Sequence, residues 1–328
     1  MKISRVGILA SVVILTMLTG SCSFYYRIMS RKALVDGAKA YNDRKFDEAE
    51  NEFRKAAGYD DSLSTFESRT AQLFLARTIH SGYAGNRGET KLAESAIAEY
   101  KKVLPAFMAD VAEKQAAVKA NPGNEMAVKE LKASEDTVGS IVRAVAGLYE
   151  NLQQQDKWKA WQTEQAKNEK LPARVRAASY ISMGAKDYNC ANEISDNEPV
   201  KKTVTVDGEP AYQFSKPEKT EDFDKLKECV AKGQEYIDAA LKLDPESDSG
   251  WSYKTSLLIQ ESRIAEMNGD SEGKEKFKTE SEKAKKKFEE LAAKRKKAEE
   301  AEARKALEER AKKEGKKVEE LEKELNPE

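Results

Sequence analysis

The chain has 328 residues, of which 35% are charged and 39% hydrophobic, and its formal net charge is −1. Lysine and arginine, 57 in all, nearly balance 58 aspartates and glutamates, so no overall field attracts nucleic acid. The charge is concentrated near the C-terminus, whereas apolar residues recur regularly upstream of about residue 270. We therefore predict a folded core upstream of that point and no nucleic-acid partner.

The first 21 residues have the plan of a secretory signal peptide. Lys2 and Arg5 precede VGILASVVILTML, thirteen residues without a charge. A helix that crosses a bilayer needs about 20 apolar residues, so this run is short for that role. We predict a signal peptide over residues 1–21 and a tether over residues 22–32.

A lone cysteine, Cys22, follows the small residues Gly20 and Ser21. The stretch resembles the lipobox of bacterial lipoproteins, in which a peptidase cuts before a cysteine that has received a diacylglycerol. It departs from that pattern because Leu18 stands four places before the cysteine rather than three, with Thr19 in the usual aliphatic place. The resemblance implies that Cys22 is the lipidated first residue of the mature chain.

An uncleaved anchor helix over residues 6–26 is the alternative to cleavage. Arg27, Arg31 and Lys32 weaken it, because they would leave positive charge on both sides of the membrane. With cleavage and lipidation, we expect the chain in the bacterial cell envelope, facing the periplasm from the outer membrane.

Two cysteines remain beyond Cys22, namely Cys190 and Cys229. An isolated pair in an oxidising compartment is a disulfide candidate. The sequence has no CxxC motif and a single histidine, so a metal or redox centre is not expected. We predict a Cys190–Cys229 disulfide and no metal or cofactor.

Residues 37–61 predict two short helices separated by a break at residues 42–45. The second helix carries apolar and small residues at spacings of three and four, which share one face. These residues are Phe46, Ala49, Phe53 and Ala56. Together with Gly37, they resemble five signature places of the tetratricopeptide repeat. Asp61 stands where that family has proline, and Ala40 where it has a large residue.

Residues 229–245 resemble the second helix of another such repeat. The matching positions are Gly233, Ile237, Ala240 and Pro245. Trp251 and Leu258 then take the large first-helix places of the next unit, while Lys254 and Thr255 depart from its usual Leu-Gly pair. The resemblance to tetratricopeptide lipoproteins of bacteria covers most of residues 34–267. It implies an all-α solenoid of helical hairpins over residues 33–270.

The middle of the chain follows this pattern more loosely. Five further helices are predicted there, over residues 65–80, 89–104, 105–120, 125–155 and 157–171. The sequence NPGN after residue 120 is a strong turn signal. We predict four or five helical hairpins in total.

Residues 192–222 interrupt one helix pair. Val204 and Val206 alternate with polar residues, and Asp207-Gly208 is the dipeptide typical of a type I′ turn. We predict a small β-hairpin insertion whose base is closed by the Cys190–Cys229 bridge.

Residues 271–328 are almost entirely lysine, glutamate, alanine and arginine. Oppositely charged residues four apart favour an exposed helix. We predict a long charged C-terminal helix that docks through Phe277, Phe288 and Leu291 and breaks near Gly315.

Signatures of enzyme chemistry are missing. His80, the single histidine, lies on a helix stripe, and the sequence contains no HExxH, GxSxG or glycine-rich phosphate loop. Trp158 and Trp161 are expected to pack between hairpins, with a groove-lining role as the alternative. We predict that the chain is not an enzyme.

The repeat resemblance implies a concave wall that binds peptides or other proteins. Six positions match that wall: Tyr41, Arg143, Glu150, Gln153, Ser252 and Ser256. The leading hypothesis is a lipid-anchored scaffold that mediates protein–protein contacts in an envelope complex. The alternative is a structural spacer whose charged tail spans the periplasm or contacts peptidoglycan.

Overall fold

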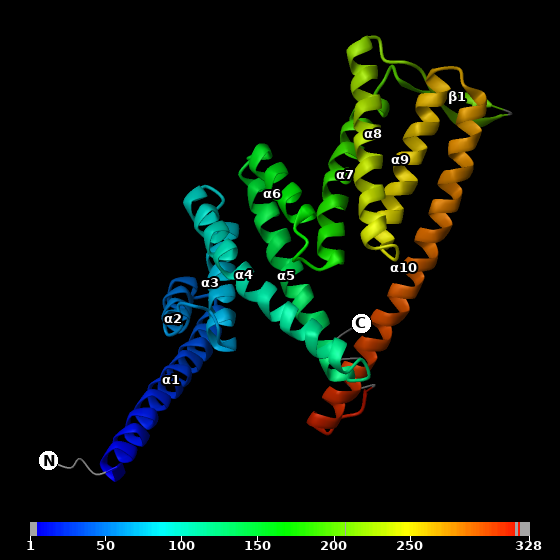
Figure 1. The fold of residues 1–328 in the computed structure, drawn as a ribbon. Helices are drawn as coiled ribbons and strands as arrows, with labels where there is room; N and C mark the ends of the chain where they lie inside the picture. Colours follow the sequence, from blue (N-terminus) through cyan, green and yellow to red (C-terminus); the bar gives the residue numbers. More distant parts are fainter. Residues whose placement is uncertain (1–4, 207, 319–320, 322–328) are drawn as a thin grey trace. The chain divides into compact units, whose positions relative to one another are not determined.

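The structure is a computed structural model that describes the backbone of residues 5–206, 208–318 and 321 and the side chains of residues 24–205, 208–318 and 321. The described chain is helical apart from one two-stranded antiparallel sheet, which confirms the predicted all-α class with a small β insertion (Figure 1). The chain divides into two compact units, Met1–Val175 and Arg176–Glu328. Each unit is described by itself.

The first unit is built from helices that pack on their neighbours in the sequence. Its helices are α1 (Arg5–Asn42), α2 (Phe46–Gly58), α3 (Phe66–Gly85), α4 (Thr90–Ala120), α5 (Glu125–Asn151) and α6 (Gln155–Lys167). Each helix packs on the next, and α1 also packs on α3. The predicted break after residue 42 and the predicted turn after residue 120 are both confirmed. Among the described residues, no helix combines the length and apolar character that a bilayer crossing requires.

Side-chain caps fix the starts of two of these helices. The Thr65 hydroxyl accepts a hydrogen bond from the Ser68 backbone N–H, and Asn124 Oδ1 accepts one from Ala127. Such caps satisfy backbone donors that have no partner in the first helical turn. The sequence therefore sets where α3 and α5 begin.

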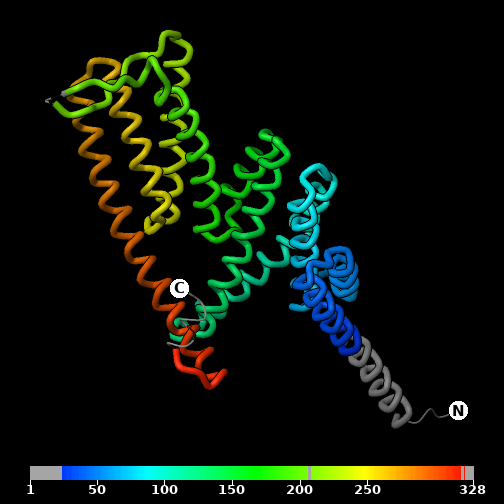
Figure 2. The backbone as a smooth tube through the Cα atoms, turned by 180° about the vertical axis from the view of Figure 1, so that it is seen from behind, coloured from blue at the N-terminus to red at the C-terminus, as the bar shows by residue number. Residues whose placement is uncertain are grey.

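The prediction of separate helices over residues 89–104 and 105–120 is wrong. Helix α4 runs without interruption from Thr90 to Ala120 with Pro105 inside it. Proline has no backbone N–H for the carbonyl of Lys101 and its ring crowds that carbonyl, so a helix that accommodates it bends rather than ends. Both views show α4 changing direction along its length (Figures 1 and 2).

Helices α1 and α2 approach each other closely because small residues line their contact. Phe53, Ala49 and Ala56 of α2 are fully buried, as the stripe of the second predicted helix requires. A methyl group on Gly37 of α1 would stand 2.8 Å from two ring carbons of Phe53. Glycine at position 37 therefore sets the distance between these two helices.

The second unit contains the remaining elements. They are most of α7 (Ala173–Ser195), β1 (Lys201–Val206), β2 (Glu209–Phe214), α8 (Thr220–Leu243), α9 (Asp248–Met267) and α10 (Ser271–Glu314). Helix α9 packs against both α8 and α10. Helix α10 runs beside α9 and continues beyond it (Figure 1).

The β-hairpin is attached to the helices by its second strand. Strands β1 and β2 pair antiparallel in a register that sets Lys201 opposite Phe214. The Phe214 backbone N–H donates to Glu266 of α9 at 3.2 Å, and the Arg263 guanidinium lies 4.5 Å from the centre of the Phe214 ring. Gly208 has a φ of +85°, as a tight turn requires, while Asp207 of the predicted turn lies outside the described residues.

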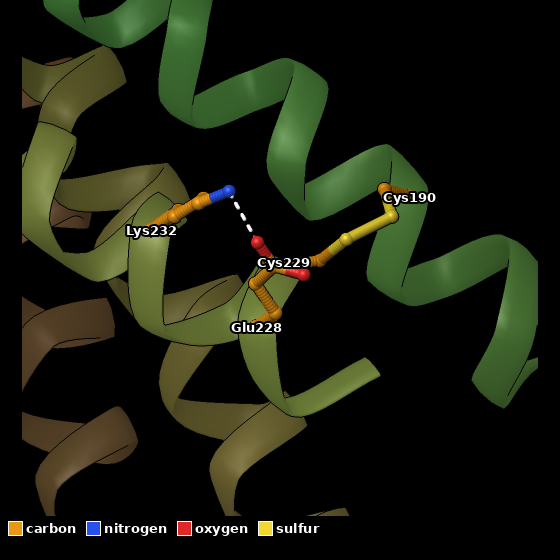
Figure 3. Close-up of a disulfide and its surroundings, with 4 residues drawn as sticks. All are labelled: Cys190, Glu228, Cys229 and Lys232. Atoms are coloured by element: carbon orange, nitrogen blue, oxygen red, sulfur yellow. Dashed lines mark hydrogen bonds and ion pairs between the residues drawn. A yellow bond between two sulfur atoms is a disulfide. The ribbon is translucent and has the colours of Figure 1, made fainter. Parts of the chain in front are cut away.

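The predicted disulfide is confirmed. Cys190 of α7 and Cys229 of α8 are bonded at 2.05 Å, with their Cα atoms 6.1 Å apart (Figure 3). Around the bond, α7, α8, α9 and the ends of the hairpin share one apolar cluster that includes Leu226 and Val230. An ion pair between Glu228 and Lys232 lies beside it on the surface of α8. The bond therefore closes the base of the β insertion, as the cysteine positions predict.

The first part of α10 is docked, and a stretch in its second half is exposed. Ser281, Ala284 and Leu291 are buried, which bears out the docking role predicted for Leu291, while Phe277 and Phe288 are half-buried. All side chains from residue 293 to residue 306 are exposed. Helix α10 ends at Gly315, whose φ of +65° belongs to the left-handed region that glycine adopts at helix ends.

Replacing Gly37 with alanine should lower the free energy of unfolding by about 1–3 kcal/mol, because the added methyl group overlaps a phenyl ring that cannot move aside. Gly147 of α5 provides the matched control, since a methyl group there meets no atom within 4 Å. Gly147→Ala should instead stabilise the chain by about 0.5–1 kcal/mol. Urea unfolding followed by circular dichroism measures both, and equal effects of the two changes would contradict the close-packing role.

Removing the disulfide should destabilise the second unit and leave the first unchanged. The two cysteines are 39 residues apart in sequence, and closing a loop of that length stabilises by about 3–4 kcal/mol in the chain-entropy model. We expect the double variant Cys190→Ser/Cys229→Ser to exchange its amide hydrogens faster throughout α7 and α8. Hydrogen exchange read by mass spectrometry resolves this, with the amides of α3 as the internal control; unchanged protection in α8 would refute the prediction.

Candidate functional site

A hollow with a partly apolar lining lies in the first unit, between α4 and α6. We refer to it as the α4–α6 groove. Its volume is about 860 Å³. The apolar part of its lining consists of Leu104, Pro105, Met108, Ala109, Ala112 and Trp161. The polar part consists of Lys101, Gln115, Glu164, Gln165, Asn168, Glu169 and Lys170.

The groove is elongated. Its α4 wall runs from Lys101 to Gln115, which at 1.5 Å per residue is about 21 Å of helix. An extended peptide of about six residues has the same length. The groove therefore has the length of a peptide segment.

Trp161 is held rigidly in the wall. Its indole N–H donates to the carbonyl of Val142 in α5 at 3.1 Å, and only 5% of the residue is exposed. The Lys101 ammonium lies 4.9 Å from the centre of the Trp161 ring and donates to the Tyr149 hydroxyl at 2.8 Å. A cation over an aromatic face is attracted to it, so these contacts tie α4 to α5 and α6 beside the groove. Of the two roles considered for Trp161, packing and groove lining, the structure gives it both.

Two glutamine side chains of α6 are buried without a full set of hydrogen bonds. Gln165, which lines the groove, is 1% exposed, and Gln162, which does not line it, is 4% exposed. The Oε1 atoms of both find no donor among the described residues. A buried carbonyl oxygen without a donor costs about 1–3 kcal/mol. Gln165 therefore carries an unused acceptor that is buried behind the surface of the groove.

A polar network holds α4 in place between α3 and α5. The Asp110 carboxylate of α4 accepts hydrogen bonds from Ser134 of α5 at 2.7 Å, from Arg69 of α3 at 2.9 Å and from Lys114 at 2.9 Å. Burial alone would raise the pKa of Asp110, but the hydrogen bonds from Ser134 and Lys114 and the nearby positive charges lower it overall. The carboxylate thus stays ionised and fixes the direction of the α4 wall.

The charged groups around the groove are balanced. Lys101 and Lys170 carry positive charge, whereas Glu164 and Glu169 carry negative charge. A lining of this kind does not select a strongly acidic or strongly basic ligand. Recognition would depend on the apolar centre, where Met108 supplies an adaptable surface.

The structure brings three of the six predicted wall residues to one end of α5. Arg143 and Glu150 are exposed on α5, and Gln153 lies in the following turn with a φ of +57°. Tyr41 is half-buried at the end of α1. Its ring packs against Phe46 and Phe74, and its hydroxyl lies 3.0 Å from that of Ser81.

Ser252 and Ser256 belong to the second unit, so the six residues do not form one described site. Both are half-buried on α9, and the Ser256 hydroxyl donates to the carbonyl of Ser252 at 3.1 Å. None of the six lines the α4–α6 groove. Their role in binding stays a prediction.

His80 packs beside Tyr100 and does not line the α4–α6 groove. Its Nδ1 lies 3.4 Å from the Tyr100 hydroxyl, and burial followed by the charge of Arg87 lowers its pKa. Within the described ranges, no cluster of three or more histidine, cysteine or acidic side chains is arranged to hold a metal ion. The side chain of Cys22, the predicted lipidation site, lies outside the described residues.

Sequence reasoning did not find the α4 wall. Leu104, Met108 and Ala112 recur every four residues, and Trp161, Gln165 and Asn168 recur at four and three. This spacing is the available signal, but it resembles ordinary core packing. The assumption that Pro105 starts a new helix divided the α4 wall in two.

No protein-family model matches the chain, and no curated protein matches its sequence. The resemblance to the tetratricopeptide repeat therefore rests on the residues quoted above.

Changing Gln162 or Gln165 to methionine should raise the free energy of unfolding by about 1 kcal/mol. Methionine is close to glutamine in size but apolar, so the change removes a buried acceptor that has no donor. Gln115→Met, at an exposed position of the groove, is the control and should change stability little. Chemical denaturation of the three variants provides the measurement. A loss of stability in both Gln162→Met and Gln165→Met would show that these amides are satisfied in solution.

Proposed function

We propose that this chain is a lipid-anchored scaffold of the bacterial cell envelope that binds a segment of a partner protein in the α4–α6 groove. The groove carries the proposal, because it joins an apolar centre to a polar margin over about 21 Å of helix. Peptide-recognition sites combine pockets for apolar side chains with polar groups that fix orientation.

The helical-hairpin packing supports a tetratricopeptide-like repeat in the first unit. Gly37, Phe53 and Ala56 occupy the close contacts that the family's small and aromatic positions make. A stack of such hairpins presents extended surfaces on successive helices. A scaffold role follows from this architecture, with partners held at a fixed place on the repeat.

The envelope location is supported by two features that do not depend on the groove. Residues 1–21 have the plan of an export signal, and Cys22 follows in a lipobox-like context. The Cys190–Cys229 disulfide fits an oxidising compartment such as the periplasm. We therefore place the mature chain facing the periplasm, with the outer membrane as its expected anchor.

A structural spacer is the second candidate, and the exposed part of α10 is the observation that favours it. Residues 293–306 have no buried side chain. Lys294 and Arg295 pair with Glu246 and Asp248 at the start of α9, whereas pairs farther along, such as Arg304 with Glu308, lie four residues apart on α10 itself. Such pairs keep a solvated helix extended. A spacer would use this length and leave the groove empty.

A photo-crosslinking amino acid in place of Ala112 tests the scaffold function in native envelopes. Ala112 is exposed and lines the groove, whereas Ala117 is also exposed but lies on another side of α4 and serves as the control. We expect a specific protein adduct from position 112 and none from position 117. Once the adduct is identified, Ala112→Glu should weaken binding of that purified partner by about tenfold or more, which corresponds to about 1.4 kcal/mol, and Ala117→Glu should leave it unchanged.

The contrary outcomes of this experiment are distinct. A partner that binds Ala112→Glu as tightly as the parent chain overturns the groove as its site. The spacer is favoured if position 112 gives no adduct and the cellular function is lost only when residues 293–314 are removed. Recovery of the native protein in soluble cytosol overturns the envelope location.

A further inference from the structure

Helix α1 exposes an unusual concentration of large apolar side chains. Five of the ten exposed large hydrophobic residues among the described side chains lie between residues 24 and 35. They are Phe24, Tyr25, Tyr26, Ile28 and Val35, with exposed fractions of 67%, 57%, 50%, 50% and 61%. Contiguous exposed apolar surface marks a site of interaction.

Three of these residues share one side of the helix. At 3.6 residues per turn, Phe24, Ile28 and Val35 fall on a single stripe. The buried positions of α1 fall on the opposite side. They are Ser30, Ala33, Gly37 and Ala40, and the Ser30 hydroxyl donates to the Ala56 carbonyl of α2 at 2.8 Å. The first unit therefore packs against one side of α1, and the stripe of Phe24, Ile28 and Val35 on the other side faces away from it.

The outward stripe is flanked by positive charge. Arg31, Lys32 and Lys39 adjoin it, are exposed, and form no ion pair within the described part of the chain. From residue 24 to residue 42, Asp36 is the single acidic side chain, and its place on the helix is off the stripe. A helix face that joins aromatic and aliphatic side chains to unpaired lysine and arginine is complementary to an anionic lipid surface.

We propose that the outward face of α1 lies on an anionic phospholipid surface. Aromatic rings settle at the level of the lipid headgroups, so Phe24 and the adjacent Tyr25 suit that interface, whereas Tyr26 packs towards Tyr59 on the other side of α1. The basic side chains would contact lipid phosphates, and Ile28 and Val35 would enter the boundary of the acyl chains. A second protein would need acidic groups matched to this charge, whereas an anionic membrane supplies them wherever the helix lands.

This inference rests on the proposed envelope location and adds a second membrane signal beside Cys22. A lipid anchor and an adjacent basic, apolar surface reinforce each other, because the anchor keeps the surface close to the bilayer. The face would hold the first unit against the membrane instead of letting it swing on a tether.

The test uses the full chain reconstituted into vesicles of phosphatidylcholine with phosphatidylglycerol. A fluorescent amino acid, dansylalanine, replaces Val35 in one preparation and Val128 of α5 in another. Val128 is also exposed, at 45%, but lies outside the proposed face. We expect spin-labelled lipids to quench the probe at position 35 and not the probe at position 128.

The charge dependence provides the second arm. Each of the changes Arg31→Gln, Lys32→Gln and Lys39→Gln removes one positive charge. Each should lower the equilibrium constant for binding of the α1 face to the vesicle surface by about fivefold. Lys129→Gln, an exposed lysine of α5, is the matched control and should have no effect. Vesicles of phosphatidylcholine alone should reproduce the loss seen when all three changes are combined in one chain.

The failures are distinguishable. If the chain floats with vesicles but position 35 is not quenched, the anchor stands and the α1 face is rejected. If position 35 is shielded in native membranes but not quenched by spin-labelled lipid, a protein covers the stripe and the lipid proposal is wrong. If the chain does not float at all, both the anchor and the α1 face are rejected, while binding of the partner by the groove is measured separately.

Discussion

The rest of the structure depends on how closely neighbouring helices approach one another at a few glycines. At Gly37, Gly184 and Gly233, an added methyl group would come within 2.8 Å of an apolar side chain on the adjacent helix. Those side chains are Phe53, Ile237 and Leu257, and all three are fully buried. Because large buried side chains cannot give way in a closely packed interior, the glycines fix the helix spacing in both units. The grooves and faces that remain on the surface follow from that spacing.

Local patterns in the sequence predict much of the fold because they act through neighbouring residues. The stripe of Phe53 and its companions, the cap at Asn124 and the lone cysteine pair each identify an element or a link. The continuous α4 could not be read in this way. Whether Pro105 ends a helix or bends it depends on contacts far away in sequence, here between Asp110 and Arg69. The α4–α6 groove was missed for the same reason, since it exists only once that helix is continuous.

The first unit uses its polar groups in two opposite ways around the groove. Asp110 is surrounded by donors and holds three helices together, so it contributes order. Gln162 and Gln165 are buried with acceptors unused, so they reduce stability. Order around the groove therefore comes from the Asp110 network and not from the two buried glutamines of α6.

The position of the disulfide has a consequence for the proposed export of the chain. Both sulfur atoms belong to the second unit, so a reducing environment that prevents the disulfide from forming affects the stability of that unit alone. A newly made chain would therefore remain looser towards its C-terminal half until it meets an oxidant. A looser second unit would suit the proposed passage through a translocation channel, and oxidation on the far side would then lock that unit in its folded form.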